Sequence, residues 1–199
     1  MKTKSYHHGD LRNLMIEKGL EFIIEHGAKS LSLRKVAAAC GVSHAAPYSH
    51  FTGKDELLVA IEKYITDQFT AVLKESVAEA GTTSEGLFRM CCAYVMFFAR
   101  NPEYYRFIFI HSDIEVGGDD DEYEPYDFFV DFLGKLFDNI NYPDELRSKT
   151  FIAQWAMIHG LASLAVMSAA HEDIRHWEEK VSDILSHNYL IPRQETSQC

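Results

Sequence analysis

Long segments almost free of glycine and proline are the feature that most constrains the fold of this chain. Residues 54–79 contain neither residue type, residues 82–101 contain only Gly86, and residues 144–191 contain only Gly160. Such segments favour long helices and argue against a fold of many short strands and turns. The sequence therefore predicts an all-α fold of about nine helices, and 47% apolar residues among 199 are enough for a real core.

Charge is distributed unevenly along the chain. The formal net charge is −11, but residues 1–54 carry more Lys and Arg than Asp and Glu, whereas residues 55–199 are strongly acidic. A basic segment suits a polyanionic partner such as nucleic acid. The acidic remainder would oppose non-specific coating of DNA, so we expect any DNA binding to be concentrated in the basic segment and to be sensitive to salt.

The cysteines and the N-terminal residues favour a cytoplasmic protein. Cys91 and Cys92 are adjacent and Cys199 ends the chain, so a disulfide framework is not expected. The adjacent pair is interpreted as small core residues, with redox sensing as the alternative. Residues 1–12 lack the apolar core of a secretion signal.

One apolar segment is long enough to span a membrane. Residues 151–170 contain no Asp, Glu, Lys or Arg, and twenty such residues can cross a bilayer. The segment nevertheless contains Gln154, His159 and six alanines, and it lacks a strongly basic flank. We therefore expect a helix that is buried between protein surfaces and no contact with a membrane.

Capping residues and glycines set the expected helix bounds. The predicted N-caps are Asp10, Ser32, Ser43 and Asn101, and the predicted helix stops are Gly27, Gly41 and Gly81. The predicted helices cover residues 11–26, 33–40, 44–51, 54–79, 86–99, 102–111, 123–139, 144–170 and 172–189, and residues 117–122 are a predicted loop. Two short helices joined by a three-residue turn are typical of a helix-turn-helix motif. We expect a three-helix head with this motif, followed by an antiparallel helical bundle.

Residues 32–54 carry the strongest functional signal. Together with the next few positions they contain nine residues at the spacing Ala-x-x-x-Gly-Val-Ser-x-x-x-x-Tyr-x-His-Phe-x-x-Lys-x-x-Leu, namely Ala37, Gly41, Val42, Ser43, Tyr48, His50, Phe51, Lys54 and Leu57. In this the chain resembles the TetR family of bacterial transcriptional regulators. The resemblance implies a DNA-binding domain over residues 8–68, with its motif at 32–51, and an effector-binding and dimerisation domain over 69–199. It also implies a homodimer that binds a palindromic operator in double-stranded DNA, with repression favoured over activation.

The resemblance assigns DNA-contacting positions one by one. Arg34 matches a position that reaches a base edge, and Lys54 matches a lysine that binds the DNA backbone. The predicted groove-reading residues are His44, Ala45 and Ala46, the predicted phosphate-binding hydroxyls are Ser43, Tyr48 and Thr52, and Ser49 and His50 complete the surface. Pro47 departs from the family pattern, where many members carry leucine, and it removes one early helical N–H.

A second, weaker resemblance lies in the C-terminal part. Trp155, His159 and Gly160 resemble the motif of the WHG-type C-terminal domain found in part of the family. Trp155 and His159 are four residues apart, so they share a helix face on which they either pack or contact a ligand. The predicted ligand-binding residues are Phe88, Cys91, Tyr94, Tyr105, Trp155 and His159, for a small apolar or aromatic effector. The family pattern also implies that the last two helices form the dimer interface.

Enzymatic alternatives lack a site. His171 and His176 are five residues apart rather than the four that a helical zinc motif needs, and Asp119, Asp120 and Asp121 lack the spacing of a calcium loop. The sequence contains no nucleophile elbow, P-loop or dinucleotide fingerprint, so we expect no catalytic residue, metal or cofactor. A protein-interaction module that ignores duplex DNA is the remaining alternative.

Overall fold

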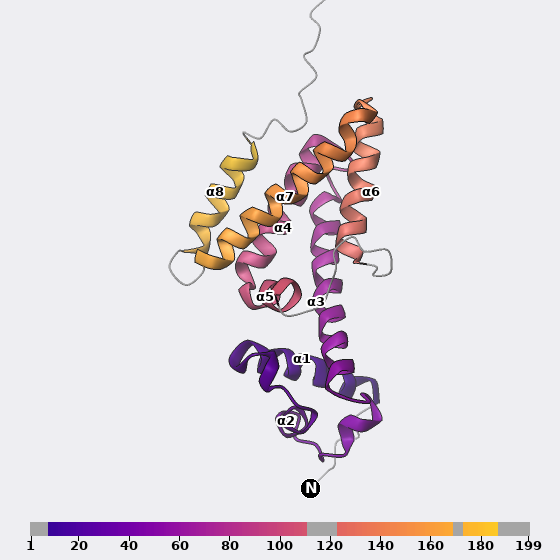
Figure 1. Ribbon diagram of the computed structural model, residues 1–199, viewed down its shortest axis with the longest axis vertical. Coiled ribbons are helices and arrows are strands. Elements are labelled where there is room, and N and C mark those ends of the chain that lie inside the picture. Colours follow the sequence, from indigo (N-terminus) through magenta and orange to yellow (C-terminus); the bar gives the residue numbers. More distant parts are fainter. Residues whose placement is uncertain (1–7, 111–122, 169–172, 187–199) are drawn as a thin grey trace, which may run out of the picture. The chain divides into compact units, whose positions relative to one another are not determined.

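The computed structural model describes residues 8–110, 123–168 and 173–186, and every regular element in these ranges is a helix. The elements in chain order are α1 (His8–His26), η1 (Ala28–Ser30), α2 (Leu33–Ala39), η2 (Ala46–Ser49), α3 (Lys54–Val77), α4 (Ser84–Arg100), α5 (Pro102–Ile110), α6 (Glu124–Asn139), α7 (Asp144–Ser168) and α8 (Ile174–Ser186) (Figure 1). The all-α prediction is therefore confirmed, with eight α-helices and two 3₁₀ helices in the described part rather than about nine α-helices.

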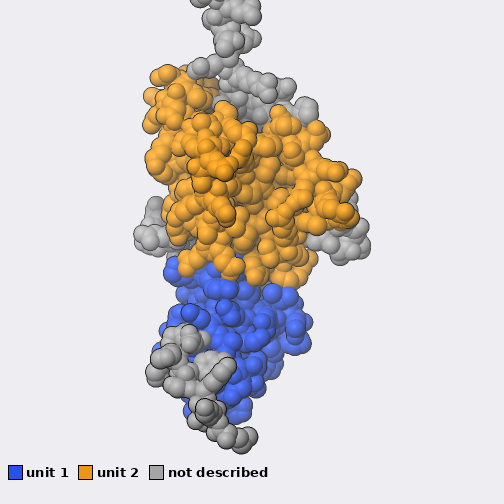
Figure 2. Space-filling model, turned by 180° about the vertical axis from the view of Figure 1, so that it is seen from behind, with its two compact units in different colours: residues 1–66, 110–112 blue, residues 67–109, 113–199 orange. Residues whose placement is uncertain are grey.

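The chain divides into two compact units. Unit 1 comprises residues 1–66 and 110–112, and unit 2 comprises residues 67–109 and 113–199 (Figure 2). Helix α3 contributes residues to both units. The predicted loop at residues 117–122, the three aspartates 119–121 and His171 lie outside the described residues, whereas His176 lies in α8.

Unit 1 has its own small core where α1, α2 and the first part of α3 meet. The buried side chains there include Met15, Leu20, Val36, Phe51, Leu57 and Ile61. Gly19 permits the close approach of α1 to α3, because a Cβ at this position would lie 2.8 Å from the Cδ1 atom of Ile61. Burying each of these large apolar side chains contributes about 1.5–3 kcal/mol, which stabilises a short helical unit.

Local signals set several helix bounds as predicted. Ser32 is the N-cap of α2, and its side chain accepts a hydrogen bond from the Lys35 amide. Gly27 and Gly41 have φ values of 78° and 69° directly after α1 and α2, in the region that glycine enters without a Cβ clash. Asp10 is not an N-cap as predicted, because α1 already begins at His8. Helix α1 thus begins three residues before Leu11, the predicted first helical residue.

The predicted third helix, residues 44–51, is the main correction. Only Ala46–Ser49 are helical, in the 3₁₀ conformation, and the N-cap is Ala45 rather than Ser43. An α-helix that starts at His44 needs an N–H at position 47 to bond the Ser43 carbonyl, and Pro47 has none. The Ala46 and Tyr48 amides instead donate three residues back, to the Ser43 and Ala45 carbonyls, which is the 3₁₀ pattern.

Unit 2 is built around α4. This helix packs most extensively against α7 and α8, and α6 packs against both α4 and α7. Its buried residues lie on all sides, as the nearly uniform apolar segment predicts, and they include Met90, Tyr94, Val95 and Phe98. Gly86 lets the start of α4 approach the preceding turn, because a Cβ there would lie 2.0 Å from the Gly81 carbonyl oxygen.

Helix α7 is apolar on its outer face as well as its inner one. By length and composition it is the one helix of the described residues that could cross a membrane, although part of it is buried inside unit 2. Its exposed side includes Ile152, Ala153, Ala156, Gly160, Leu164 and Met167. Residues at these spacings fall on one face of an α-helix. We call this set the α7 stripe.

Candidate DNA-binding surface and aromatic cluster

The predicted DNA-contacting residues all lie in unit 1, between the start of α2 and the start of α3. Arg34, Ser43, His44, Ala45, Tyr48, Ser49 and Thr52 are exposed, and Ala46, His50 and Lys54 are half-buried. Tyr48 is 58% exposed although it is a large aromatic residue. An accessible arrangement of polar and small side chains around η2 is compatible with a surface that meets DNA.

Three of these residues have intramolecular partners that the sequence did not reveal, and the Ser49 hydroxyl donates to the Ala46 carbonyl oxygen at 2.7 Å. The Lys54 ammonium donates to the Lys29 carbonyl oxygen at 3.2 Å, which leaves two of its three protons for another acceptor. The Thr52 amide and hydroxyl both donate to a carboxylate oxygen of Glu56, at 2.6 and 2.8 Å. These two bonds from Thr52 lower the pKa of Glu56. Glu56 thus holds the chain at the entrance to α3.

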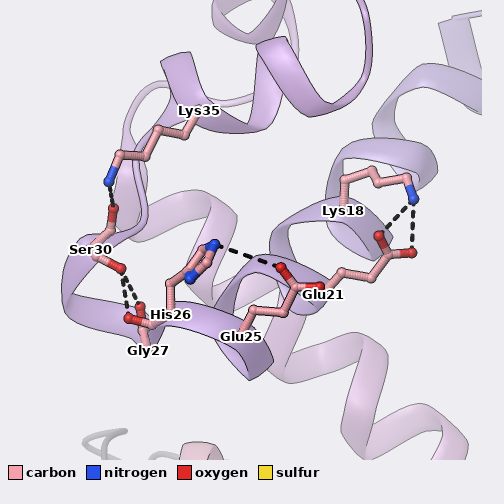
Figure 3. A network of polar contacts seen from close by, with 7 residues as sticks. All are labelled: Lys18, Glu21, Glu25, His26, Gly27, Ser30 and Lys35. Carbon is pink, nitrogen blue, oxygen red and sulfur yellow. Dashed lines mark hydrogen bonds and ion pairs between the residues drawn. The ribbon is translucent and has the colours of Figure 1, made fainter.

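A polar network fixes the connection between α1 and α2 (Figure 3). The Ser30 hydroxyl lies 2.8 Å from the His26 carbonyl oxygen and 3.0 Å from that of Gly27. The Lys35 ammonium donates to the Ser30 carbonyl at 2.7 Å and lies 5.1 Å from the centroid of the Phe22 ring. Lys35, which the sequence alone presents as a solvated charge, therefore helps to hold α2 against α1. With Lys54 it satisfies two carbonyl groups of η1.

Four of the six predicted ligand-binding residues meet in unit 2. The Tyr94 hydroxyl lies 3.0 Å from Nδ1 of His159, and the Tyr105 hydroxyl lies 3.1 Å from Nε2 of the same ring. Trp155 stacks on His159 with a centroid distance of 6.4 Å and an interplanar angle of 13°. These residues come from α4, α5 and α7, and we call them the aromatic cluster.

Phe88 and Cys91 lie on α4 without a contact to this cluster among the described interactions. Phe88 is half-buried and Cys91 is 2% exposed. Burial raises the pKa of the Cys91 thiol strongly, and it raises the pKa of Cys92 to about 11. Both thiols are therefore protonated at neutral pH and poor nucleophiles, which favours the interpretation of the pair as core residues.

Two further aromatic residues complete the surroundings of His159. The Phe109 ring lies edge-on, with its centroid 4.7 Å from that of His159, and the Tyr126 ring lies 5.0 Å from that of Trp155. Neither residue could be predicted from the sequence, because no local pattern separates a ring at this cluster from any other apolar position of α5 or α6.

Burial controls the ionisation of the cluster. It lowers the pKa of His159, so the imidazole is neutral at physiological pH. Burial also raises the pKa of Tyr94, and the neighbouring Tyr123 and Tyr105 raise it further. Within the described residues, no group of three or more His, Cys, Asp or Glu side chains is placed to hold a metal ion.

The fold and the η2 region define a helix-turn-helix protein with a separate helical C-terminal unit. Residues 15–61 match the model for bacterial regulatory proteins of the tetR family, and residues 87–183 match the model described as tetracyclin repressor-like, C-terminal domain. Together these matches span most of the chain. It belongs to the TetR family, whose members are regulators and not enzymes.

Curated relatives match over part of their length. An uncharacterized HTH-type transcriptional regulator of Mycobacterium tuberculosis is 29% identical over 109 residues, which are 53% of this chain and 45% of that protein. The fatty acid metabolism regulator protein of Bacillus subtilis is 29% identical over 73 residues, 37% of this chain and 38% of that protein. The matched part is thus less than half the length of either relative.

Solved structures match over nearly the whole described fold. A protein of unknown function from Rhodococcus sp. RHA1 has a TM-score of 0.71 at 24% identity, with 92% of this chain and 97% of that chain covered. The transcriptional regulator FadR from Bacillus subtilis, in complex with stearoyl-CoA, has a TM-score of 0.64 at 18% identity, with coverages of 87% and 96%. At these identities the likeness concerns the fold.

Proposed function

We propose that this protein is a ligand-responsive, sequence-specific DNA-binding transcriptional regulator, and that it is a repressor released from an inverted-repeat operator by a small molecule. The observation that carries the proposal is the helix-turn-helix segment in a tetR-family match, with the residues expected to face DNA accessible around η2. Residues 8–68 form the DNA-binding domain and residues 69–199 the effector-binding and dimerisation domain. Cytoplasmic location follows from this role.

In the proposed complex, η2 enters the major groove. His44, Ala45 and Ala46 face base edges, and Arg34 reaches a further base from the start of α2. Ser43, Tyr48, Ser49 and His50 contact the DNA backbone around them. Lys54 uses its two remaining protons for a phosphate, while its bond to the Lys29 carbonyl fixes its position. The Thr52 hydroxyl binds a phosphate only if its proton turns from Glu56 to a phosphate oxygen, because phosphate oxygens accept hydrogen bonds and do not donate them.

The α7 stripe is the proposed centre of a homodimer, with α8 beside it. Ile152, Leu164 and Met167 are 61%, 55% and 73% exposed in the single chain, and burying them against a second copy is favourable. Ala153, Ala156 and Gly160 between them are small enough for two helices to approach closely. On α8, Ile184 is also an exposed apolar residue, at 44%. A two-fold dimer can place its two heads in successive major grooves, about 34–36 Å apart.

The aromatic cluster is the proposed effector site. The proposal keeps the interpretation that this part of the chain resembles a WHG-type domain. An apolar or aromatic molecule would contact Trp155 and His159, with Phe88 and Cys91 at the α4 side. The solved relative from Bacillus subtilis holds stearoyl-CoA, which supports an apolar body as the feature to test first. An effector that binds more tightly to a conformation in which the two DNA-binding domains do not match the operator spacing lowers DNA affinity by linkage.

Selection of bound fragments from random duplex DNA at moderate salt tests the proposal. Wild-type protein is expected to enrich an inverted repeat, and binding to this sequence should weaken as salt rises. The double variant Tyr48→Ala/Lys54→Ala should lose enrichment while remaining folded by circular dichroism. Lys135→Ala, which removes an exposed α6 charge paired with Asp131, is the matched control and should enrich the same repeat. A folded dimer that enriches nothing, even at low salt, would favour the interaction-module alternative.

A further inference from the structure

The Tyr94–His159–Tyr105 part of the aromatic cluster contains one more proton than its hydrogen bonds can use. Each tyrosine hydroxyl carries one proton, and a neutral imidazole carries one on a single ring nitrogen. The three side chains therefore hold three donor protons. They share only two hydrogen bonds, one at each nitrogen of His159, at 3.0 and 3.1 Å. One donor must point away from the group.

The surroundings indicate which hydroxyl carries the extra proton. Since neutral His159 has one donor and one acceptor nitrogen, one tyrosine must donate to it and the other must accept from it. Tyr94 is 1% exposed and packs against the rings of Phe69, Phe98 and Trp155. An outward proton on Tyr94 would be buried among aromatic rings, and an unsatisfied buried donor is costly.

This cost places the outward proton on Tyr105. Tyr94 then donates to Nδ1 of His159, and the N–H at Nε2 donates to the Tyr105 oxygen. Tyr105 is the less buried of the two, at 6% exposed. Among the residues that the structure describes, no hydrogen bond leads from its hydroxyl to any acceptor outside the cluster.

The side chains around this donor are partly accessible. His159 and Trp155 are half-buried rather than buried, and so is Phe109, whose ring lies 5.0 Å from that of Tyr105. The group therefore combines half-buried aromatic surface with one directed hydrogen-bond donor. That combination fits a ligand with an apolar body and one acceptor atom.

We propose that the effector carries an acceptor oxygen, a carbonyl or a carboxylate, on an apolar body and that it accepts a hydrogen bond from the Tyr105 hydroxyl. The inference rests on the effector site proposed above and adds the chemical class of its ligand. A ligand without an acceptor would displace water and leave the Tyr105 proton without a partner. The site should therefore discriminate between molecules of equal shape that differ in this one oxygen.

Isothermal titration calorimetry of the full chain at pH 7.5 tests this with 2-acetylnaphthalene and 2-ethylnaphthalene, which match in size. We expect the ketone to bind about 2- to 13-fold more tightly, the range for one net hydrogen bond. Tyr105→Phe should abolish the preference. Tyr126→Phe, which removes a hydroxyl from another ring beside Trp155, should retain it. A third titration, with 2-naphthoate, shows whether carbonyl or carboxylate is the better acceptor.

Equal affinities for ketone and hydrocarbon, or no binding of the ketone, would overturn the proposal. So would a preference that survives Tyr105→Phe. Nuclear magnetic resonance of ¹⁵N-labelled histidine adds a ligand-free measurement, in which His159 is expected as the Nε2–H tautomer, and the Nδ1–H tautomer would contradict the assignment. Neither experiment contains DNA. A protein that selects an operator but shows no preference for the ketone would therefore refute this inference alone.

Discussion

Shortening Leu164 to alanine is expected to weaken the proposed dimer. Leu164 lies in the middle of the α7 stripe and is 55% exposed in the single chain. The change removes three carbon atoms, each contributing about 0.8 kcal/mol on full burial. Scaled by the exposed fraction and counted for both copies of a two-fold interface, the loss is about 2.6 kcal/mol, which raises the dimer dissociation constant about 80-fold.

Sedimentation equilibrium over a range of protein concentrations measures this change. Val130→Ala is the matched control, because Val130 is 41% exposed on α6, a helix that the proposal does not assign to the interface. It should leave the dissociation constant unchanged. Circular dichroism should show the same helix content in both variants, since each site is exposed. A wild-type monomer, or equal dissociation constants for Leu164→Ala and wild type, would refute the assignment of the stripe to the dimer.

Three further predictions concern the DNA surface, the start of α4 and the buried histidine. Lys54→Ala should lower the slope of log K against log salt by about one, as for one lost phosphate contact, whereas an unchanged slope with weaker binding would assign Lys54 to its bond with Lys29 alone. Gly86→Ala should destabilise the protein by about 1–3 kcal/mol in urea unfolding, because its Cβ would lie 2.0 Å from the Gly81 oxygen. Gly134→Ala, with nothing within 4 Å of its Cβ, should stabilise α6 by about 0.5–1 kcal/mol. A Gly86→Ala variant more stable than Gly134→Ala would contradict the packing at the start of α4. Since burial lowers the pKa of His159 below 6.5, the unfolded chain binds its proton first, so folding stability should fall as pH drops below 6.5. His159→Gln should make unfolding free energy less dependent on pH between 7.5 and 5.5, and an unchanged dependence would exclude this histidine as its source.

Features that depend on a few neighbouring residues could be predicted from the sequence. Ser32 bonds the amide three residues on, and Gly27 and Gly41 adopt positive φ at helix ends. These outcomes follow from local capping and from the missing Cβ of glycine, so no tertiary information is needed. The same holds for the long helices, whose bounds lie within three residues of expectation as far as they are described.

The η2 segment differs from the helix predicted over residues 44–51. Proline is common in the first turn of a helix, so Pro47 does not by itself argue against a helix there. In a helix of only eight expected residues, the missing N–H removes the first intrahelical bond, and the remaining bonds settle into the 3₁₀ pattern. Here the length of the helix decided the outcome.

The pairings inside the aromatic cluster could not be predicted. Tyr94 and Tyr105 lie 65 and 54 residues from His159 in sequence, and composition marks them only as aromatic residues of apolar helices. Their contact with opposite edges of one imidazole depends on how α4, α5 and α7 pack. Likewise, the bond from Lys54 to Lys29 spans 25 residues, so the motif that identifies Lys54 does not reveal its partner.

The 3₁₀ conformation of η2 has a consequence for the information content of an operator. Four residues at a rise of about 2.0 Å span about 8 Å, whereas the eight-residue α-helix expected from the sequence would span about 12 Å. At about 3.4 Å per base pair, η2 covers little more than two base pairs of each half-site. Two base pairs in each of two half-sites specify about one sequence in 256, still far short of the roughly million competing sites in a genome. In the proposed complex, the remaining discrimination must come from Arg34, His44 and Ala45 outside η2, from the symmetry and spacing of the half-sites, and from the deformability of the DNA between them.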